Sequence, residues 1–146
     1  MSYAIHPSSA AAKPMRLLLG LCILLIHAYH SEASVFQAGP NDYTTYLSRL
    51  MPGDTLLLGP GQYLKNLTLK NIQGTPERPV VITGSDDATV FTANPCCNTV
   101  SLTQCAYLVL SHFTLDGQKQ FVDAIKAEGT TGNWTHHVTI EYLNIK

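Results

Sequence analysis

Leu50-Met-Pro-Gly-Asp-Thr-Leu-Leu-Leu58 opens a series of short apolar segments, which continues with Gly61-Gln-Tyr63 and Gly74-Thr-Pro-Glu-Arg-Pro-Val-Val-Ile-Thr-Gly84. Glycine, proline or an acidic residue interrupts each segment. We predict strands at Val35–Phe36, Thr55–Leu58, Leu67–Leu69, Val80–Thr83, Val90–Thr92, Val100–Thr103, Leu108–Leu110 and Phe113–Leu115. Strands this short, separated by such frequent turns, indicate an all-β protein.

An internal repeat indicates which all-β fold this is. Ala106–Leu115 aligns with His136–Ile145 at an offset of 30 residues, so that Leu108, Leu110, Phe113 and Leu115 fall on Val138, Ile140, Leu143 and Ile145. Units of this kind, stacked at the same register, form a parallel ladder with a continuous apolar interior. A sandwich or barrel would need more hairpin turns of the Asn-Gly or Asp-Gly type than the single Asp116-Gly117. The repeat therefore predicts a solenoid.

These motifs resemble those of a known superfamily. The segment 50–84 resembles the opening coils of secreted right-handed parallel β-helix proteins, the pectate-lyase-like superfamily, and looks most similar to the alginate lyase and chondroitinase B group. The similarity extends over about residues 35–146. It implies an all-β, right-handed parallel β-helix.

A short amphipathic helix is predicted ahead of the first coil. Tyr43, Tyr46, Leu47 and Leu50 follow helical spacing, and Pro52-Gly53 ends the pattern. Asn41 or Asp42 is the predicted N-cap. We expect the apolar side of this helix to cap the open end of the first coil and to block edge-to-edge pairing.

The turn after this helix has a specific chemical requirement. Gly53 and Gly61 allow a positive φ angle. Asp54 is expected to accept backbone N–H bonds in the turn that begins the coil.

The N-terminal residues have the features of a secretory signal peptide. Met15-Arg16 precedes an apolar run from Leu17 to Ile26, and Ser31 and Ala33 form a small-x-small ending. We predict an extension and signal peptide over residues 1–33, cleavage after Ala33, and a β-helix domain over residues 34–146. The alternative is an uncleaved membrane anchor, although the apolar run is short for a membrane span. The expected location is extracellular, or periplasmic or on the cell surface if the source is bacterial.

The net charge limits the classes of binding partner to be expected, and the cysteine content limits the possible disulfide bonds. Residues 34–146 contain seven Lys and Arg against nine Asp and Glu, without the basic stripe of a nucleic-acid-binding protein. We therefore expect no nucleic acid and, after cleavage, no membrane contact, and the oligomeric state stays open. Cys22 would leave with the signal peptide, which leaves an odd number of cysteines, and Cys105 is expected to pair with Cys96 or Cys97. Asn66-Leu-Thr68 and Asn133-Trp-Thr135 are candidate N-glycosylation sites.

No catalytic or metal-binding constellation emerges from the polar residues. His136 and His137 are adjacent in a predicted strand, so their side chains should point to opposite faces and make a poor chelating pair. His112 is expected to be a structural or solvated turn histidine, and Asp86-Asp87 a solvated turn with too few oxygen ligands for calcium. Trp134 and Tyr142 could stack on sugar rings or serve in packing.

The resemblance implies chemistry that lies beyond these coils. The similar lyases use a Lys or Arg base to remove the proton α to a uronate carboxyl group, which calcium or positive side chains neutralise, whereas β-helix hydrolases use pairs of carboxylates. In those lyases the catalytic and calcium-binding residues follow the opening coils. No catalytic residue is carried over, and Lys119 and Lys126 are the only base candidates. We expect no cofactor in this chain and leave calcium open for the full-length protein.

The chain ends on the strand-like residues 142–146 with no recognisable C-terminal cap. We expect it to be the N-terminal fragment of a longer protein, the alternative being a complete short chain that oligomerises. The predicted function is the N-terminal part of a secreted carbohydrate-active enzyme, a polysaccharide lyase for uronate-containing polymers. The alternative is a non-catalytic extracellular β-helix protein that binds glycans or cell surfaces. Residues 34–146 alone are expected to be inactive.

Overall fold

Short parallel strands wind into successive coils in the described part of the computed structural model, which comprises Met1 and residues 32–146. Residues 2–31, which hold nearly all of the predicted signal peptide, lie outside the described residues. Glu32–Lys146 forms one compact unit. Among the described residues, no helix is long and apolar enough to cross a membrane.

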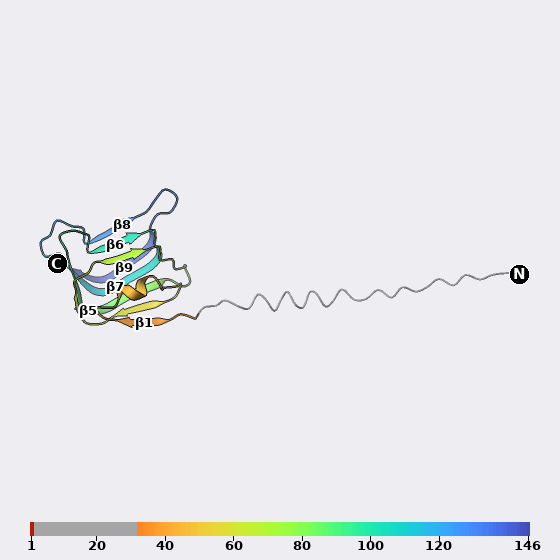
Figure 1. Ribbon diagram of the computed structural model, residues 1–146, viewed down its shortest axis with the longest axis horizontal. Coiled ribbons are helices and arrows are strands. Elements are labelled where there is room, and N and C mark those ends of the chain that lie inside the picture. The colour runs from red at the N-terminus through yellow and green to blue at the C-terminus, as the bar shows by residue number, and fades with distance from the viewer. Residues whose placement is uncertain (2–31) are drawn as a thin grey trace. The chain divides into compact units, whose positions relative to one another are not determined.

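The coils build two parallel sheets (Figure 1). The first contains, in spatial order, β1 (Val35–Ala38), β2 (Thr55–Leu58), β5 (Val80–Thr92), β7 (Ala106–Asp116) and β9 (His136–Ile145), with β3 (Gly61–Tyr63) also paired to β5. The second contains β4 (Leu67–Lys70), β6 (Val100–Thr103) and β8 (Ile125–Glu128). Every crossover from one strand to its parallel neighbour thus passes around the coil. The predicted right-handed parallel β-helix is confirmed.

The register of the coils follows the internal repeat. Leu108 pairs with Val138, Leu110 with Ile140, Phe113 with Leu143 and Leu115 with Ile145, as the 30-residue offset predicts. The strand β8 was not predicted, because Ile125-Lys-Ala-Glu128 has neither an apolar run nor a clear alternation. Its partner β6 supplies the pairing that holds it in the sheet.

The interior is apolar because alternate residues of each strand point inward. In β2, Leu56 and Leu58 are buried while Thr55 and Leu57 are partly exposed. Aromatic rings continue the stack from coil to coil: the centroids of Tyr63 and Phe91 are 4.6 Å apart, and those of Phe91 and Phe113 are 5.4 Å apart. Offset and edge-on ring pairs at these distances add to the hydrophobic contribution.

The long strands β5, β7 and β9 each contain a residue with a left-handed backbone at an interior bend. These residues are Asp86 (φ 50°), His112 (φ 57°) and Tyr142 (φ 51°). The sequence predicted separate strands on either side of these positions. Strand pairing instead runs through the bend, because a single left-handed residue turns the chain without ending the ladder.

The helix before the first coil is shorter than predicted. It spans α2 (Thr44–Leu47), and its N-cap position is Tyr43. The predicted N-cap at Asn41 or Asp42 is wrong, since the Asp42 carboxylate accepts a hydrogen bond from the backbone N of Gly39 at 2.7 Å instead.

Tyr43 itself is fully buried and packs edge-on against the rings of Tyr63 and Phe91. Its hydroxyl donates to the Lys65 carbonyl at 2.8 Å, and burial raises the pKa of this phenol to about 12. That the helix acts as a cap stays a prediction.

The predicted role of Asp54 is confirmed. Its two carboxylate oxygens accept hydrogen bonds from the backbone N atoms of Ser34 and Met51, each at 2.8 Å, and the residue is 3% exposed. Gly53 and Gly61 have the predicted positive φ angles, 92° and 146°. The carboxylate thus ties the segment before β1 to the turn before β2.

Phe113 and Phe121 form a matched pair for testing the stacked core. Phe113 is fully buried against Phe91, whereas Phe121 is fully exposed. Phe113→Ala should lower the free energy of unfolding by about 3–5 kcal/mol, because it removes a buried ring and leaves a cavity. Phe121→Ala should change it by no more than about 0.5 kcal/mol. Urea unfolding followed by circular dichroism measures both, and equal effects would contradict the stacked-core description.

Candidate functional site

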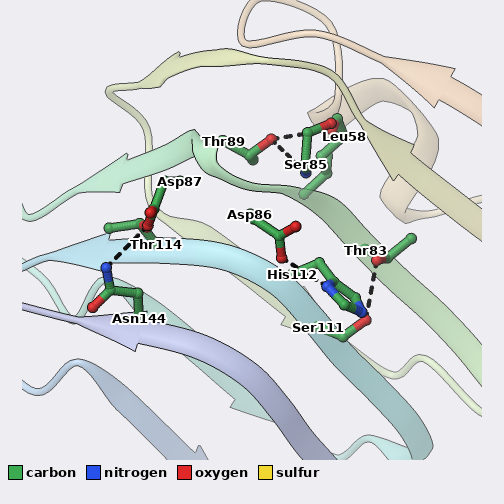
Figure 2. A network of polar contacts seen from close by, with 10 residues as sticks. All are labelled: Leu58, Thr83, Ser85, Asp86, Asp87, Thr89, Ser111, His112, Thr114 and Asn144. Atoms are coloured by element: carbon green, nitrogen blue, oxygen red, sulfur yellow. Dashed lines mark hydrogen bonds and ion pairs between the residues drawn. The ribbon is translucent and has the colours of Figure 1, made fainter.

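The three left-handed residues form a row on the outer face of successive coils, which we call the corner ladder: Asp86, His112 and Tyr142. An Asp86 carboxylate oxygen lies 2.7 Å from His112 Nδ1 (Figure 2). The His112 ring stacks on the Tyr142 ring, with centroids 4.8 Å apart and planes 14° apart. Since a carboxylate only accepts hydrogen bonds, Nδ1 of His112 carries the proton in this contact.

A second polar row runs beside the corner ladder. One oxygen of Asp87 accepts hydrogen bonds from Thr114 Oγ1 at 3.1 Å and from Asn144 Nδ2 at 3.0 Å (Figure 2). The bond from Asn144, then that from Thr114, and to a lesser extent the charge of Lys146 lower the pKa of Asp87. Asp87 is therefore a carboxylate over the whole physiological pH range.

The two rows border a shallow cleft of about 270 Å³. Its lining residues are Asp86, Asp87, Phe113, Tyr142, Leu143 and Asn144. Tyr142 is 72% exposed, so one face of its ring is open to solvent while the other contacts His112.

Hydrogen bonds between coils hold the backbone behind the rows. Ser111 Oγ donates to Thr83 Oγ1 at 3.0 Å. The buried hydroxyl of Thr89 accepts a bond from the Ser85 N at 3.0 Å and lies 3.2 Å from the Leu58 carbonyl, to which it donates (Figure 2). Both ends of the segment that carries Asp86 and Asp87 are thus fixed to neighbouring coils.

The two rows place an exposed aromatic ring beside hydrogen-bond acceptors. An exposed tyrosine ring can lie against the apolar face of a sugar, and carboxylates can accept bonds from its hydroxyl groups. The imidazole of His112 could exchange a proton through its other nitrogen. Asp86 and Asp87 are anionic, however, so they would repel a uronate carboxylate rather than neutralise it.

The predicted orientation of the histidine pair is wrong. His136 Nδ1 and His137 Nδ1 lie 2.7 Å apart, and the His137 ring stacks on Tyr107 with centroids 4.6 Å apart. A left-handed backbone at His137 (φ 51°) breaks the strict alternation of a strand and brings both rings to one side. A hydrogen bond between two ring nitrogens needs one donor and one acceptor. Among the described residues, no group of three His, Cys, Asp or Glu side chains could hold a metal ion.

The two lysines considered as base candidates lie apart from the corner ladder. Lys126 belongs to β8 in the other sheet, and its ammonium lies 2.8 Å from the Glu128 carboxylate. That hydrogen bond raises the pKa of Lys126, which keeps it protonated and opposes a role as a base. Lys119 lies exposed in the segment after β7. Trp134 is exposed in the segment before β9, so it and Tyr142 do not share a strand.

The predicted pairing of Cys105 is wrong. Cys96 forms a disulfide with its neighbour Cys97, and Cys105 is a buried free thiol. The Cys105 side chain points into the coil interior and lies 3.5 Å from the Leu69 carbonyl, whereas Cys96 and Cys97 occupy an exposed turn. Burial raises the pKa of the Cys105 thiol.

The two sequons differ in their surroundings. Asn66 Nδ2, the atom that a glycan would modify, donates to the Asn98 carbonyl at 2.7 Å. Asn133 is exposed in a turn closed by backbone hydrogen bonds with Thr130. Glycosylation of either residue stays a prediction.

The sequence did not identify the corner ladder, although one signal was available. The repeat that aligns Phe113 with Leu143 also aligns His112 with Tyr142, which places both at the same corner of successive coils. The contact with Asp86 could not be found in this way, because β5 and β7 are paired with two register shifts.

The described residues form a parallel β-helix. Two solved structures are similar to it. One is a mannuronic acid specific polysaccharide family 6 lyase from human gut microbiota, with a TM-score of 0.60 and 18% identity over 75% of this chain. The other is the PL6 family alginate lyase AlyGC, with a TM-score of 0.59 and 15% identity over 76% of this chain.

The chain spans only part of each of these lyases, 26% of the first and 15% of the second. At these identities the likeness shows the fold. No protein-family model matches the sequence, and no curated protein matches it.

The cysteine assignment predicts a simple thiol count. In residues 34–146, a thiol reagent should find no reactive thiol in the native protein, because Cys105 is buried and the other two cysteines are joined. In denaturant without reductant it should find a single thiol, at Cys105. Mass spectrometry after alkylation locates the label, and a label on Cys96 or Cys97 under these conditions would contradict the assignment.

The lowered pKa of Asp87 predicts an acid-dependent effect of Asn144→Ala. The Asn144 bond favours the carboxylate, so its contribution is present above the unfolded pKa of about 3.9 and is lost as the pH falls through the lower folded pKa. Asn144→Ala should therefore destabilise the protein at neutral pH and have a smaller effect below about pH 3. Urea midpoints across this range measure it. Asn133→Ala is the control, and an effect of Asn144→Ala that does not change with pH would refute the coupling.

Proposed function

We propose that the chain forms the first coils of a secreted carbohydrate-active protein of the polysaccharide lyase type, which acts on uronate-containing polymers. The observation that carries this proposal is the coil architecture, which matches two polysaccharide lyases over three quarters of the chain. The predicted signal peptide supports secretion, and a polysaccharide is the partner that this fold comparison favours.

Within this proposal, the described coils contribute sugar contacts and scaffold rather than the elimination step. Tyr142 offers an open aromatic face, and Asp86 and Asp87 offer hydrogen-bond acceptors beside it. A lyase must also neutralise the uronate carboxylate and present a base to the α-carbon. Asp86 and Asp87 bring two carboxylates instead, so the proposal assigns neither of these roles to the two rows.

The alternative function is a non-catalytic extracellular β-helix protein that binds glycans or cell surfaces. The exposed corner ladder favours glycan binding under both proposed functions, because binding does not require catalytic groups. Product formation by the whole protein distinguishes the two functions, because only a lyase leaves an unsaturated uronate at the new chain end.

The proposal is tested by measuring binding and cleavage separately. Residues 34–146 should bind alginate, pectate or chondroitin sulfate in affinity electrophoresis without releasing ultraviolet-absorbing unsaturated product. Tyr142→Ala should weaken binding roughly tenfold, which corresponds to about 1.4 kcal/mol for a lost aromatic contact. Phe121→Ala, which removes an exposed aromatic ring outside the corner ladder, is the control.

Two outcomes would refute this division of roles. Unsaturated product from residues 34–146 would place the chemistry in these coils. Equal binding by the wild type and Tyr142→Ala would exclude the corner ladder as a sugar contact.

A further inference from the structure

A buried carboxylate faces a backbone nitrogen at the entrance to the first coil. The Ser34 N lies 2.8 Å from Asp54 Oδ1, and the other oxygen of Asp54 is held by the Met51 N. Asp54 is almost fully buried, whereas Ser34 is exposed. The Ser34 carbonyl accepts a hydrogen bond from the Thr55 N at 2.9 Å, so both ends of this residue are fixed next to β2.

The Ser34 nitrogen is also the atom that the predicted signal cleavage would change. Hydrolysis of the Ala33–Ser34 peptide bond adds the oxygen of water to the Ala33 carbonyl carbon and transfers protons to the Ser34 nitrogen. Ala33 leaves as a carboxylate at the end of the released peptide. The Ser34 nitrogen becomes an α-ammonium group, which has three N–H donors and a positive charge in place of one neutral N–H.

We propose that the Asp54 carboxylate is the binding site for the amino terminus that this cleavage creates. The new ammonium lies against the same oxygen that already accepts the Ser34 N–H, so no rearrangement is required. The present bond already has an ionised acceptor, and the ammonium adds an ionised donor, so that the contact becomes an ion pair. Maturation thereby strengthens the attachment of the first strand, because β1 begins at the next residue and pairs with β2 from Val35 onward.

Two charged residues, Arg78 and Glu32, lie near the residues next to this pair. Arg78, in the turn before β5, lies against Gly53, whose added Cβ would be 2.8 Å from the Arg78 Nε. Glu32 precedes the cleavage point and leaves with the released peptide. A comparison of two chains that both lack Glu32 and both keep Arg78 therefore isolates the new amino group.

The pairing predicts a defined dependence on pH. An unpaired α-amino group has a pKa of about 7.7–8.0, and the nearby carboxylate raises it in the folded protein. The added stability is therefore fully present below about pH 7.7 and is lost as the pH rises through the raised folded pKa.

The test compares residues 34–146 with residues 33–146, which retain the peptide bond to Ala33. Both contain nearly all of the compact unit Glu32–Lys146. At neutral pH the shorter chain should have a roughly tenfold larger folding equilibrium constant, the equivalent of one pKa unit. The difference should disappear at high pH. Urea unfolding from about pH 6 to about pH 10 spans the transition. Equal stability of the two chains at every pH would overturn the proposal.

Variants assign the effect to Asp54. Asp54→Asn should abolish the difference between the two chains, whereas Asp42→Asn, which alters a carboxylate in another turn, should leave it intact. If Asp54→Asn does not fold, acetylation of the Ser34 amino group replaces it and should remove the added stability. A difference that survives acetylation would refute the pairing.

The proposal rests on cleavage after Ala33, which has a separate test. N-terminal sequencing of the protein secreted from the full chain should begin at Ser34. If the secreted protein begins at another residue, the Ser34 ammonium does not form in nature and the pair with Asp54 does not exist there. The stability comparison above decides separately whether Asp54 binds the amino group. The two failures can therefore be distinguished.

Discussion

Parallel pairing of β5 with β7 and of β7 with β9 is the constraint on which the rest of the structure depends. β9 repeats the path of β7 in register, whereas β5 and β7 are paired with a register shift on either side of Asp86. The buried stack of Tyr63, Phe91 and Phe113 is one consequence. The outer row of Asp86, His112 and Tyr142 is another, since side chains at equivalent corners come within contact distance whatever their chemical type.

The same constraint explains how much of the fold could be predicted. An alignment of Ala106–Leu115 with His136–Ile145 yields the register of β7 and β9, because a solenoid repeats in sequence as it repeats in space. Pro52-Gly-Asp54 predicts the turn and its buried acceptor, because a positive φ and a carboxylate are local requirements of that turn. The local turn motif and the sequence repeat were therefore sufficient to predict the architecture.

The error on the histidine pair originates in a single left-handed residue. Strict alternation places neighbouring side chains on opposite faces of a strand, but His137 has a positive φ and its ring meets that of His136. A histidine, aspartate or tyrosine in the sequence does not indicate a positive φ angle in the way that a glycine does. The cysteine assignment failed for a separate reason: proximity in sequence does not reveal that Cys105 points into the coil while Cys96 and Cys97 occupy an exposed turn.

The corner ladder and the row beside it carry the carboxylates of Asp86 and Asp87. Abstraction of a proton next to a uronate carboxylate requires positive charge at that carboxylate and an unprotonated base. The corner ladder instead places His112 beside a carboxylate, and Lys126 is held protonated by Glu128 in the other sheet. The parallel stacking of coils therefore also brings Asp86 and Asp87 beside the exposed ring of Tyr142, and under the proposed function such a surface suits contact with sugar hydroxyl groups better than the elimination of a uronate.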